Sequence, residues 1–552
     1  MQSKPSLNNF FQNAIKDNWE RLSMTDFNGV SFQYKDVARK IIKLHLLYEH
    51  AHIKKGDKIA LCGKNSSQWG VSFLSILTYG AVAVPILHEF KSDNIHHLVN
   101  HSEAKLLIVD GGIWENLDPE SMPGLEGVLK LNDFSLLLSR RETLSDARAH
   151  LNEYFGQRFP ERFTADDVVF FEDEPDEVAL INYTSGSTGF SKGVMLTYRN
   201  LWSNLQYTID KLPYLQAGDS VVSMLPMAHM YGLSVDFLQA FIKGVQICFL
   251  TRVPSPRVIL EAFATVKPRI IVTVPLIIEK IVKGKVFPML EKPLMKILMH
   301  VPFVDDRLQA RIKAKLAEAF GGNCCEIIVG GAGLNIDVER FLRKIGFPYT
   351  VGYGMTECAP LISYAPWHDN RLGSCGKVVD RMEIKVDSPD PATIPGVLWT
   401  RGENVMAGYF KNQEATDAIM RDGWMSTGDI CNIDHEGFLY IRGRDKNMIL
   451  GPSGQNIYPE EIEQKLNNMP FVSESIVVEQ DGRLVALIYP DIELMTAQGL
   501  KEADIHPTME ENLTTLNKEL PAYSQLSRFK LFNEEFEKTP KRSIKRYLYQ
   551  NS

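Results

Sequence analysis

Short runs of apolar and β-branched residues alternate with longer amphipathic stretches from about residue 57 onward. Residues 58–63 are KIALCG, residues 66–80 are SSQWGVSFLSILTYG, and residues 81–86 are AVAVPI. A polar helical stretch follows, and then another apolar run, KLLIVDGG, at residues 105–112. This alternation of strand and helix is typical of a mostly parallel α/β sheet. We therefore expect an α/β fold.

The most apolar stretch, Val71 to Leu87, is 17 residues long and carries no charge. A helix needs about 20 apolar residues to span a bilayer, and Gly80 and Pro85 interrupt this stretch. It therefore predicts a buried helix followed by a strand rather than a membrane span.

The strand-like runs continue along the chain and then change in character. Further runs are DEVALINYTSG, GDSVVSMLPM, GVQICFL, RIIVTVP and CCEIIVGGAG. They predict one large N-terminal body with parallel-type sheets and more than one subdomain. After about residue 380, MEIKVDSP, GVLWTRG and GFLYIRGR predict short antiparallel strands. We expect a small β subdomain at about residues 380–443.

The last hundred or so residues predict a compact α+β domain. A helix is expected from Pro459, which is followed by two glutamates, and a hairpin is expected to turn at Asp481 and Gly482. The predicted domains are therefore residues 1–445 and a smaller, mobile C-terminal domain, residues 446–552.

Composition narrows the function classes. The chain has 60 Lys plus Arg against 68 Asp plus Glu, a net charge of −8, which argues against a nucleic-acid partner. The 7 cysteines include adjacent Cys324 and Cys325 but no CxxC spacing, which favours reduced thiols, with this pair packed in the core. The first residues lack a signal-peptide pattern, so we expect a cytoplasmic protein. His97 and His101 lack the Glu of HExxH and predict a solvated helix face.

The segment NYTSGSTGFSKG, residues 182–193, follows an apolar run and contains three glycines, five Ser or Thr residues and Lys192. Backbone N–H groups, hydroxyls and one cation suit a polyphosphate. A flexible Ser/Gly linker is the alternative, but the loop lies between predicted strand and helix segments. The Walker pattern is absent from the sequence, so this is not the usual nucleoside triphosphatase loop.

Together with four further segments, this loop resembles the adenylate-forming (AMP-binding) superfamily, most closely the bacterial fatty acyl-CoA synthetases. The segments are YTSGSTGFSKGVMLTYRN, GYGMTE, STGDI, GRDKNMI and EKTPKRSIKR, in that order. The family often has a basic residue and a proline where this chain has Phe190 and Ser191, but Lys192 is retained.

The resemblance implies roles for named residues. Thr184 and Glu357 would hold Mg²⁺, and Thr356 would act beside Glu357. The outer phosphates would lie on Ser185, Gly186, Ser187, Thr188, Gly189 and Lys192. Adenine would lie against Tyr353, Gly354, Gly331 and Ala332. The ribose would bind Asp429, and Arg444 would contact the nucleotide. Lys446 would be the pivot between the domains. Plain alternatives remain for three of these: a solvated carboxylate at Glu357, a turn-former at Asp429, and a tight turn at Gly331.

The segment MLPMAHMYGLSVDFL resembles the acyl-site helix of the family and places His229 beside the substrate carboxylate, although a core histidine is the alternative. Amino-acid-activating members have an aspartate where this chain has Met230, so an amino acid is disfavoured. Leu233, Val235 and Phe237 are compatible with an alkyl chain.

The C-terminal motif departs from the family pattern. Ser543 stands where members have a lysine that bridges the carboxylate and the α-phosphate. Lys538, Lys541 and Lys545 flank the position, and Lys545 is our candidate replacement, whereas Ser543 as a helix cap is the alternative.

The resemblance implies an enzyme that converts a fatty acid, ATP and coenzyme A to acyl-CoA, AMP and pyrophosphate with Mg²⁺. Two alternatives stay open: a ligase for an acyl carrier protein, and a catalytically weak protein that binds nucleotide and lipid. A lipid substrate also leaves peripheral contact with the inner membrane face open.

Overall fold

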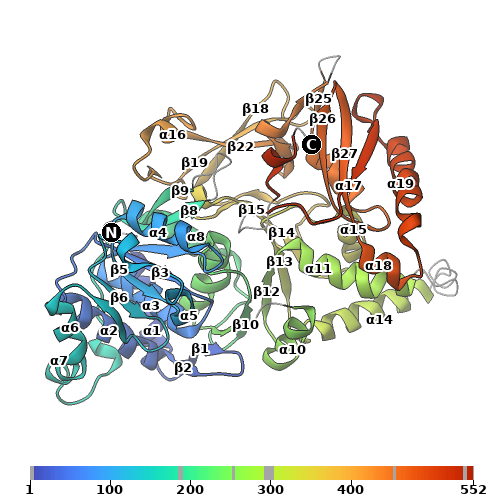
Figure 1. The fold of residues 1–552 in the computed structure, drawn as a ribbon. Coiled ribbons are helices and arrows are strands. Elements are labelled where there is room, and N and C mark those ends of the chain that lie inside the picture. The colour runs from blue at the N-terminus through green and yellow to red at the C-terminus, as the bar shows by residue number, and fades with distance from the viewer. Residues whose placement is uncertain are drawn as a thin grey trace. The chain divides into compact units, whose positions relative to one another are not determined.

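The computed structural model describes residues 5–184, 191–251, 255–290, 304–451, 455–538 and 544–550. The chain forms two compact units. Unit 1 includes Met1–Thr184, Ser191–Glu383 and Arg401–Gly423, and unit 2 includes Ile384–Thr400 and Trp424–Ser552. The α/β fold class, with a large N-terminal body and a smaller C-terminal domain, is confirmed (Figure 1). The boundary between residues 445 and 446 stays a prediction.

The largest sheet of unit 1 has the strand order β20-β9-β8-β4-β3-β5-β6-β7. Its strands are β3 (Lys58–Cys62), β4 (Val82–Ile86), β5 (Ala104–Val109), β6 (Gly127–Lys130), β7 (Leu136–Ser139), β8 (Val178–Thr184), β9 (Lys192–Thr197) and β20 (Gly408–Tyr409). Strands β3, β4, β5 and β8 are parallel, whereas β9 runs antiparallel to β8. The expected parallel core is therefore present, with antiparallel strands added at its edges.

Two other sheets of unit 1 have the orders β10-β11-β1-β2 and β12-β13-β14, and a small third sheet has the order β15-β16-β17. The strands are β1 (Leu22–Asp26), β2 (Ser31–Gln33), β10 (Ser220–Ser223), β11 (Gln246–Phe249), β12 (Ile270–Thr273), β13 (Glu326–Val329), β14 (Tyr349–Val351), β15 (Tyr353–Gly354), β16 (Leu361–Tyr364) and β17 (Lys377–Val378). The predicted apolar runs all form strands.

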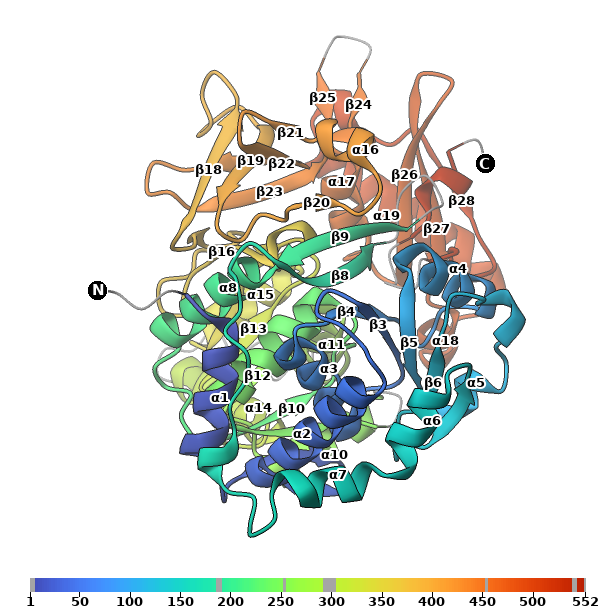
Figure 2. The ribbon, with the colours of Figure 1, turned by 90° about the vertical axis from the view of Figure 1, so that its left-hand side faces the viewer.

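Helices pack against these sheets, and α8 lies beside β9 (Figures 1 and 2). The main helices are α1 (Leu7–Asp17), α2 (Tyr34–His50), α3 (Ser67–Tyr79), α4 (Ser92–Ser102), α6 (Glu142–Ala149), α7 (Leu151–Arg158), α8 (Tyr198–Lys211), α9 (Gln239–Ile242), α10 (Pro256–Val266), α11 (Pro275–Ile281), α14 (Val304–Ala319) and α15 (Ile336–Lys344).

The segment Val71–Leu87 forms a buried helix and a strand, as predicted. Helix α3 begins after Ser66, whose side chain accepts a hydrogen bond from the N–H of Trp69. It ends at Gly80, where φ is +91°, a conformation that favours glycine. Strand β4 follows and is buried throughout. In the described part of the chain, no helix is both long and apolar enough to cross a membrane.

Unit 2 contains the short antiparallel strands and the C-terminal domain. Its strands are β18 (Met382–Asp387, which begins in unit 1), β19 (Gly396–Gly402, which ends in unit 1), β22 (Trp424–Ile433), β23 (Leu439–Arg444), β24 (Ile449–Leu450), β25 (Asn456–Ile457), β26 (Val472–Gln480), β27 (Arg483–Pro490) and β28 (Arg528–Leu531). Its main helices are α17 (Pro459–Leu466), α18 (Ile492–Ala497) and α19 (Ile505–Glu519). The predicted helix start at Pro459 and the predicted turn at Asp481 and Gly482, with φ of +52° and +71°, are confirmed.

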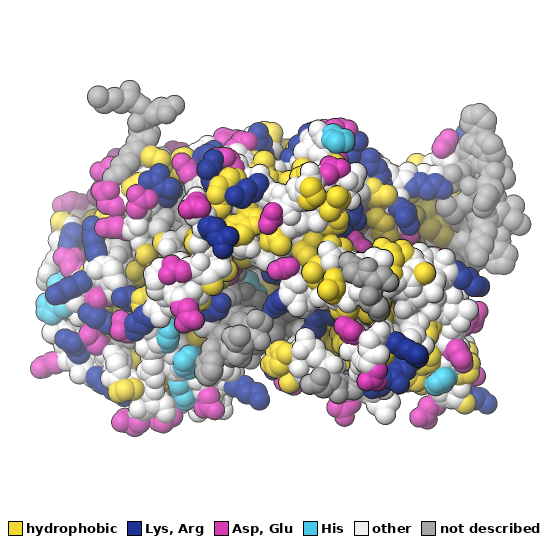
Figure 3. All heavy atoms as spheres, turned by 90° about the horizontal axis from the view of Figure 1, so that it is seen from above, with side chains coloured by type: hydrophobic (Ala, Val, Ile, Leu, Met, Phe, Trp, Pro, Cys, Tyr) yellow, Lys and Arg dark blue, Asp and Glu magenta, His cyan; other side chains and the backbone are white. Residues whose placement is uncertain are grey.

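The surface mixes charges of both signs. Figure 3 shows Lys and Arg side chains interspersed with Asp and Glu side chains on the face that it views. All 7 cysteines lie in the described part and are free thiols. Cys324 is half-buried and packs against the core around β12 and β13, as predicted.

Phe237 is a core residue of unit 1. Its ring lies 6.3 Å from that of Phe241 and 6.0 Å from that of Phe249, and Gly70 leaves room for it on α3. Replacing Phe237 with Ala should lower the free energy of unfolding by about 3–5 kcal/mol, measured as a lower urea midpoint. The control is Val169→Ala, because Val169 is 69% exposed. Equal midpoints for the two variants would contradict the core assignment.

Candidate active site

The predicted phosphate loop connects two paired strands. Thr184 ends β8 and lies opposite Lys192, which begins β9, and the Thr184 hydroxyl donates to the Lys192 carbonyl over 3.5 Å. The structure therefore brings together the two ends of the loop. The predicted ligands Ser185, Gly186, Ser187, Thr188 and Gly189 lie outside the described residues.

The helix expected after this loop is present, but a strand that the sequence analysis did not predict precedes it. Residues 192–197 form strand β9, and α8 begins only at Tyr198. The backbone of β9 pairs along β8, and Thr197 then caps α8 by accepting a hydrogen bond from the N–H of Asn200. Pairing with a neighbouring strand therefore decided the conformation of a segment that is too short to show a clear period.

Glu357 lies in a 3₁₀ turn, η5 (Thr356–Cys358), one residue after the β15 strand that carries Tyr353 and Gly354. The Glu357 side chain is buried, whereas Tyr353 and Thr356 are half-buried. A Cβ on Gly354 would lie 2.0 Å from the carbonyl oxygen of Pro360, so only glycine fits there. The turn thus presents a carboxylate from a sterically fixed backbone.

Tyr409, which the sequence analysis missed, lies between Lys192 and Glu357. Its hydroxyl donates to Glu357 Oε1 over 2.8 Å, and Lys192 Nζ lies 4.9 Å from the centre of its ring. Tyr409 belongs to the short strand β20, which pairs with β9. A strand of two residues is too short to show a periodic hydrophobic pattern, so the sequence carries no signal that would identify Tyr409.

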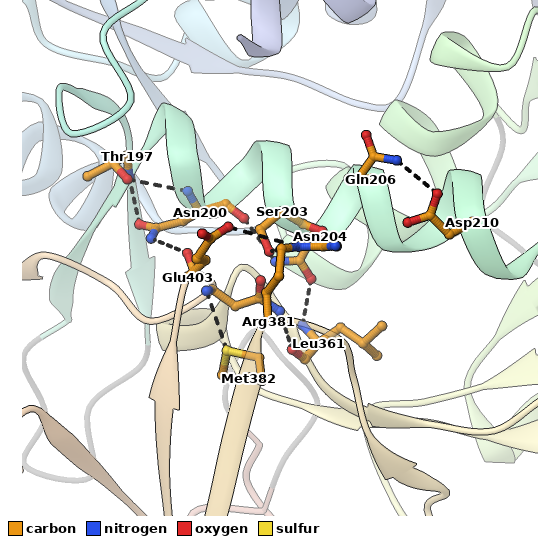
Figure 4. A network of polar contacts seen from close by, with 11 residues as sticks. Thr197, Asn200, Ser203, Asn204, Gln206, Asp210, Leu361, Arg381, Met382 and Glu403 are labelled. Carbon is orange, nitrogen blue, oxygen red and sulfur yellow. Dashed lines mark hydrogen bonds and ion pairs between the residues drawn. The ribbon is translucent and has the colours of Figure 1, made fainter. Parts of the chain in front are cut away.

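Polar side chains of α8 bind backbone groups next to the Glu357 turn, and Figure 4 shows Asn204 of α8 bonded to Leu361. The amide of Asn204 donates to the Cys358 carbonyl over 3.2 Å and accepts from the N–H of Leu361 over 3.0 Å. One side chain therefore serves the backbone on both sides of the bend that follows Glu357.

The same face of α8 holds a second segment, residues 403–405. The amide of Asn200 donates to the carbonyls of Glu403 and Val405 over 2.8 and 2.9 Å. The next residue, Met406, donates its N–H to the Glu357 carbonyl over 2.8 Å. These bonds connect the strand that carries Tyr409 with the turn that carries Glu357.

The predicted adenine loop follows β13. Gly331 has φ of +85°, and both Gly331 and Ala332 are exposed. The neighbouring Gly330 faces Tyr231, since a Cβ there would lie 2.8 Å from the tyrosine ring. The Tyr231 hydroxyl donates to the carbonyls of Thr273 and Ile328 over 3.2 and 3.0 Å. Tyr231 thus fixes the base of this loop.

Buried and half-buried polar side chains hold the segment that leads to His229. Asn65 donates to the Leu225 carbonyl over 2.6 Å, and Asn182 donates to the Ala228 carbonyl over 2.9 Å. Asp236 accepts from the N–H of Leu225 over 3.4 Å, and burial raises the pKa of Asp236 to about 7. The half-buried His229 therefore follows a rigid segment.

The predicted acyl-site helix is a π-helix, η3 (Tyr231–Leu238). Leu233 and Phe237 are fully buried, and Val235 is nearly so. Since Phe237 packs against other core aromatics, it is a structural residue of the core.

The predicted histidine pair lies on α4. His97 is exposed as expected, whereas His101 is half-buried and its Nδ1 lies 2.7 Å from the Tyr183 hydroxyl. Within the described residues, no cluster of His, Cys, Asp and Glu could hold a metal ion by itself.

In unit 2, Asp429 and Arg444 lie opposite each other on β22 and β23. Arg444 Nε is 2.7 Å from Asp429 Oδ1, and the Asp429 side chain is 6% exposed. The alternative of a turn-former at Asp429 is wrong, because Asp429 lies within the ten-residue strand β22. Gly428, with φ of +68°, is a local irregularity on one side of it, and the pairing with β23 shifts register between Ile430 and Cys431 on the other side.

The predicted pivot Lys446 is exposed in the 3₁₀ turn η6 (Asp445–Asn447). In the tail, Lys545 Nζ is 2.5 Å from Glu537 Oε1, and this hydrogen bond raises the pKa of Lys545. Lys538 pairs with Glu474 and Glu535 at 2.5 and 3.0 Å. Lys541 and Ser543 lie outside the described residues.

Comparison with known families decides the class of the protein. Residues 11–410 match the family "AMP-binding enzyme". The chain belongs to this family. Residues 446–551 match the "AMP-binding enzyme C-terminal domain". The predicted superfamily is therefore confirmed.

Curated relatives include ligases for long-chain fatty acids. A long-chain-fatty-acid–CoA ligase of Escherichia coli O157:H7 is 30% identical over 77% of this chain and 74% of its own length. The long-chain-fatty-acid–CoA ligase FadD15 of Mycobacterium bovis is 28% identical over 77% of this chain and 71% of its own length. A probable acyl-activating enzyme 16 of Arabidopsis thaliana is 28% identical over 89% of this chain and 76% of its own length.

Solved structures share the fold at lower identity. ATP-bound MatB from Rhodopseudomonas palustris is 22% identical, with a TM-score of 0.76 over 99% of both chains. The o-succinylbenzoate coenzyme A synthetase MenE from Bacillus subtilis, in complex with AMP, is 20% identical, with a TM-score of 0.74 over 99% of this chain and 98% of that one. These similarities extend the fold assignment to both units.

The Asn204 amide should be required for the geometry of the Glu357 turn. Asn204→Ala removes the partner of the buried Cys358 carbonyl and of the partly buried Leu361 N–H, and a buried group left unpaired costs about 1–3 kcal/mol. We expect a lower urea midpoint and slower ATP–pyrophosphate exchange.

The matched control for Asn204→Ala is Gln206→Ala on the same helix, because Gln206 donates to Asp210 at the surface. Both changes raise helix propensity, so this contribution cancels in the comparison. Equal exchange rates for the two variants would refute the role of Asn204.

Proposed function

We propose that this protein activates a fatty acid with ATP to form an acyl-adenylate and pyrophosphate, and then transfers the acyl group to coenzyme A. One observation carries the proposal. Thr184 lies opposite Lys192 in the pairing of β8 with β9, and Tyr409 contacts both Lys192 and Glu357. The chain that brings these residues together belongs to the AMP-binding enzyme family.

The first half-reaction needs charge neutralisation more than proton transfer. A carboxylate attacks the α-phosphate, and pyrophosphate leaves, so an anion approaches a highly anionic group. Lys192 would bind the outer phosphates together with the loop residues that follow Thr184. The structure supports this because Lys192 extends from the strand end at which the loop closes.

Magnesium fits the residues of this site. Thr184 offers a hydroxyl oxygen and Glu357 a buried carboxylate, the oxygen donors that this hard cation prefers. In the described part of the chain, Tyr409 donates to Oε1 of Glu357, and the second oxygen would be the one offered to a ligand. When bound, the ion would neutralise phosphate charge.

The remaining nucleotide contacts are proposed as follows. Adenine lies against Tyr353, Gly354, Gly331 and Ala332. Thr356 acts beside Glu357 at the phosphates. Asp429 accepts hydrogen bonds from the ribose hydroxyls, and Arg444, its partner in the structure, contacts the nucleotide. The support is that Gly331 and Ala332 are exposed, and that Arg444 already orients the Asp429 carboxylate.

A fatty acid is the proposed substrate for two reasons. Met230 is buried where a counter-charge for an amino group would be needed, so a buried ammonium would be unpaired. Curated relatives that share 28–30% identity carry the name long-chain-fatty-acid–CoA ligase. His229 would lie beside the substrate carboxylate at the end of its rigid segment.

The second half-reaction requires a different arrangement of the C-terminal domain, with Lys446 as the proposed pivot. Arg442 of β23 pairs with Glu461 of this domain at 3.4 Å. Both groups are partly exposed, so exchanging this contact for water costs little.

A weakly catalytic, ligand-binding protein is the second candidate. The observation that favours it is that Lys545 and Lys538 are both engaged with glutamates, while Ser543 replaces the family lysine.

The products of the reaction test the proposal. With a fatty acid, ATP, Mg²⁺ and coenzyme A, we expect AMP and pyrophosphate in equal amounts. Lys192→Ala should slow their release by about 10²–10³-fold, because it removes a charge-stabilising group. Nucleotide chromatography and a pyrophosphate assay measure both. Stoichiometric ADP and orthophosphate would exclude the mechanism.

The tail lysine can be tested through its glutamate partner. If Lys545 contacts the reacting groups, Glu537→Gln should free its ammonium and raise the rate of adenylate formation, whereas Lys545→Ala should lower it. Thioester formation from a supplied acyl-adenylate should change little in both variants. Single-turnover assays separate the two steps.

Lys541→Ala is the control for loss of positive charge in the tail. If Lys545→Ala forms adenylate at the parent rate while Ser543→Lys increases it, the tail supplies no adenylation cation. That outcome would strengthen the second candidate.

A further inference from the structure

Tyr409 makes a hydrogen bond to one predicted ligand-binding group and a ring contact to another. Its hydroxyl lies 2.8 Å from Glu357 Oε1, and its ring centre lies 4.9 Å from Lys192 Nζ. We propose that Tyr409 is a positioning residue that orients the Glu357 carboxylate for a divalent cation and the Lys192 ammonium for phosphate. The inference rests on the proposed function, since that assigns the two ligand groups.

The hydrogen bond has a fixed direction. The Tyr409 hydroxyl donates to Glu357 Oε1 over 2.8 Å, because a carboxylate can only accept. A donor on Oε1 fixes the rotation of the carboxylate, and Oε2 would be the oxygen that holds a cation. When a group that hydrogen-bonds to a metal-ligating side chain is removed, metal affinity typically falls by about 10–100-fold.

The ring contact orients the lysine without neutralising it. A cation over an aromatic face is attracted by the ring quadrupole, and the ammonium keeps its charge and its donors. Among the described residues, Lys192 and Glu357 form no ion pair with each other; Tyr409 lies between them. Both charges are therefore retained for a ligand, although they lie on neighbouring segments.

The backbone of Tyr409 is held firmly enough for this role. Its N–H donates to the Thr416 hydroxyl over 2.9 Å, and it lies opposite Val194 in the pairing of β20 with β9. The next N–H, of Phe410, donates to the Gly193 carbonyl over 2.7 Å. Tyr409 is thus fixed to the strand that begins with Lys192, and this sets the distance between ring and ammonium.

Two substitutions separate the contributions of hydroxyl and ring. Tyr409→Phe removes the hydrogen bond and keeps the ring, whereas Tyr409→Leu removes both. The matched control is Tyr198→Phe, because the buried Tyr198 hydroxyl donates to the Leu77 carbonyl over 2.9 Å, away from Lys192 and Glu357. All variants are made in the full chain. Their ligand binding is compared at a temperature at which every variant is folded.

Binding is measured without a fatty acid, so that no turnover is required. Electron paramagnetic resonance of free Mn²⁺ gives the Mn²⁺ affinity in the presence of ATP, and calorimetry in EDTA gives the affinity for metal-free ATP. Tyr409→Phe should weaken Mn²⁺ binding by about tenfold or more and leave metal-free ATP binding unchanged. Tyr409→Leu should weaken both, and Tyr198→Phe neither.

A double-mutant cycle gives an independent test. In the background of Glu357→Gln, the change Tyr409→Phe should no longer alter Mn²⁺ affinity, because the two groups act as one unit. Parent-like Mn²⁺ binding by Tyr409→Phe, or equal further weakening in both backgrounds, would overturn the inference. The inference would also be overturned if the parent protein bound no Mn²⁺ in the presence of ATP.

The two proposals fail in different ways. A parent protein that binds Mn²⁺ and ATP, shows the Tyr409 effects, and yet releases no pyrophosphate with any fatty acid would refute the proposed function and keep the role of Tyr409. A protein that forms acyl-CoA while Tyr409→Phe binds Mn²⁺ normally would refute the role of Tyr409 alone.

Discussion

Buried backbone groups in irregular segments need hydrogen-bond partners, and in unit 1 the side chains of α8 provide them. Asn204 serves the bend that follows Glu357, and Asn200 serves the segment that leads to Tyr409. These segments are far apart in the sequence and belong to no common sheet. The positions of the carboxylate and of its tyrosine partner therefore both depend on one polar helix face.

Amides suit this task better than ions. An asparagine side chain carries a donor and an acceptor, so one residue can serve an N–H and a carbonyl together. It also adds no net charge, whereas a buried ion would need its own compensation. The asparagines of α8 thus hold the backbone, and the charges of Lys192 and Glu357 are not needed for that task. The proposed chemistry, which needs free positive charge and a metal-binding carboxylate, depends on this separation of structural and functional groups.

Unit 2 uses its charged residues differently. Asp429 pairs with Arg444, and Lys545 pairs with Glu537, each pair having an exposed member. Ion pairs near the surface contribute only about 0–1 kcal/mol, so the partly exposed pair of Lys545 and Glu537 can exchange partners at little cost. This property agrees with the proposed two-step reaction, in which groups of the C-terminal domain change partners between the half-reactions.

The sequence by itself determined the local elements and the family. The helix and strand of Val71–Leu87, the turn at Asp481 and the helix start at Pro459 follow from nearby residues, because capping, φ preference and periodicity act over a few positions. Only the tertiary structure decided that a strand follows the phosphate loop and that Tyr409 contacts Glu357 and Lys192. These depend on pairing between distant segments, and a short strand such as β20 acquires its conformation from its neighbour instead of from its own sequence.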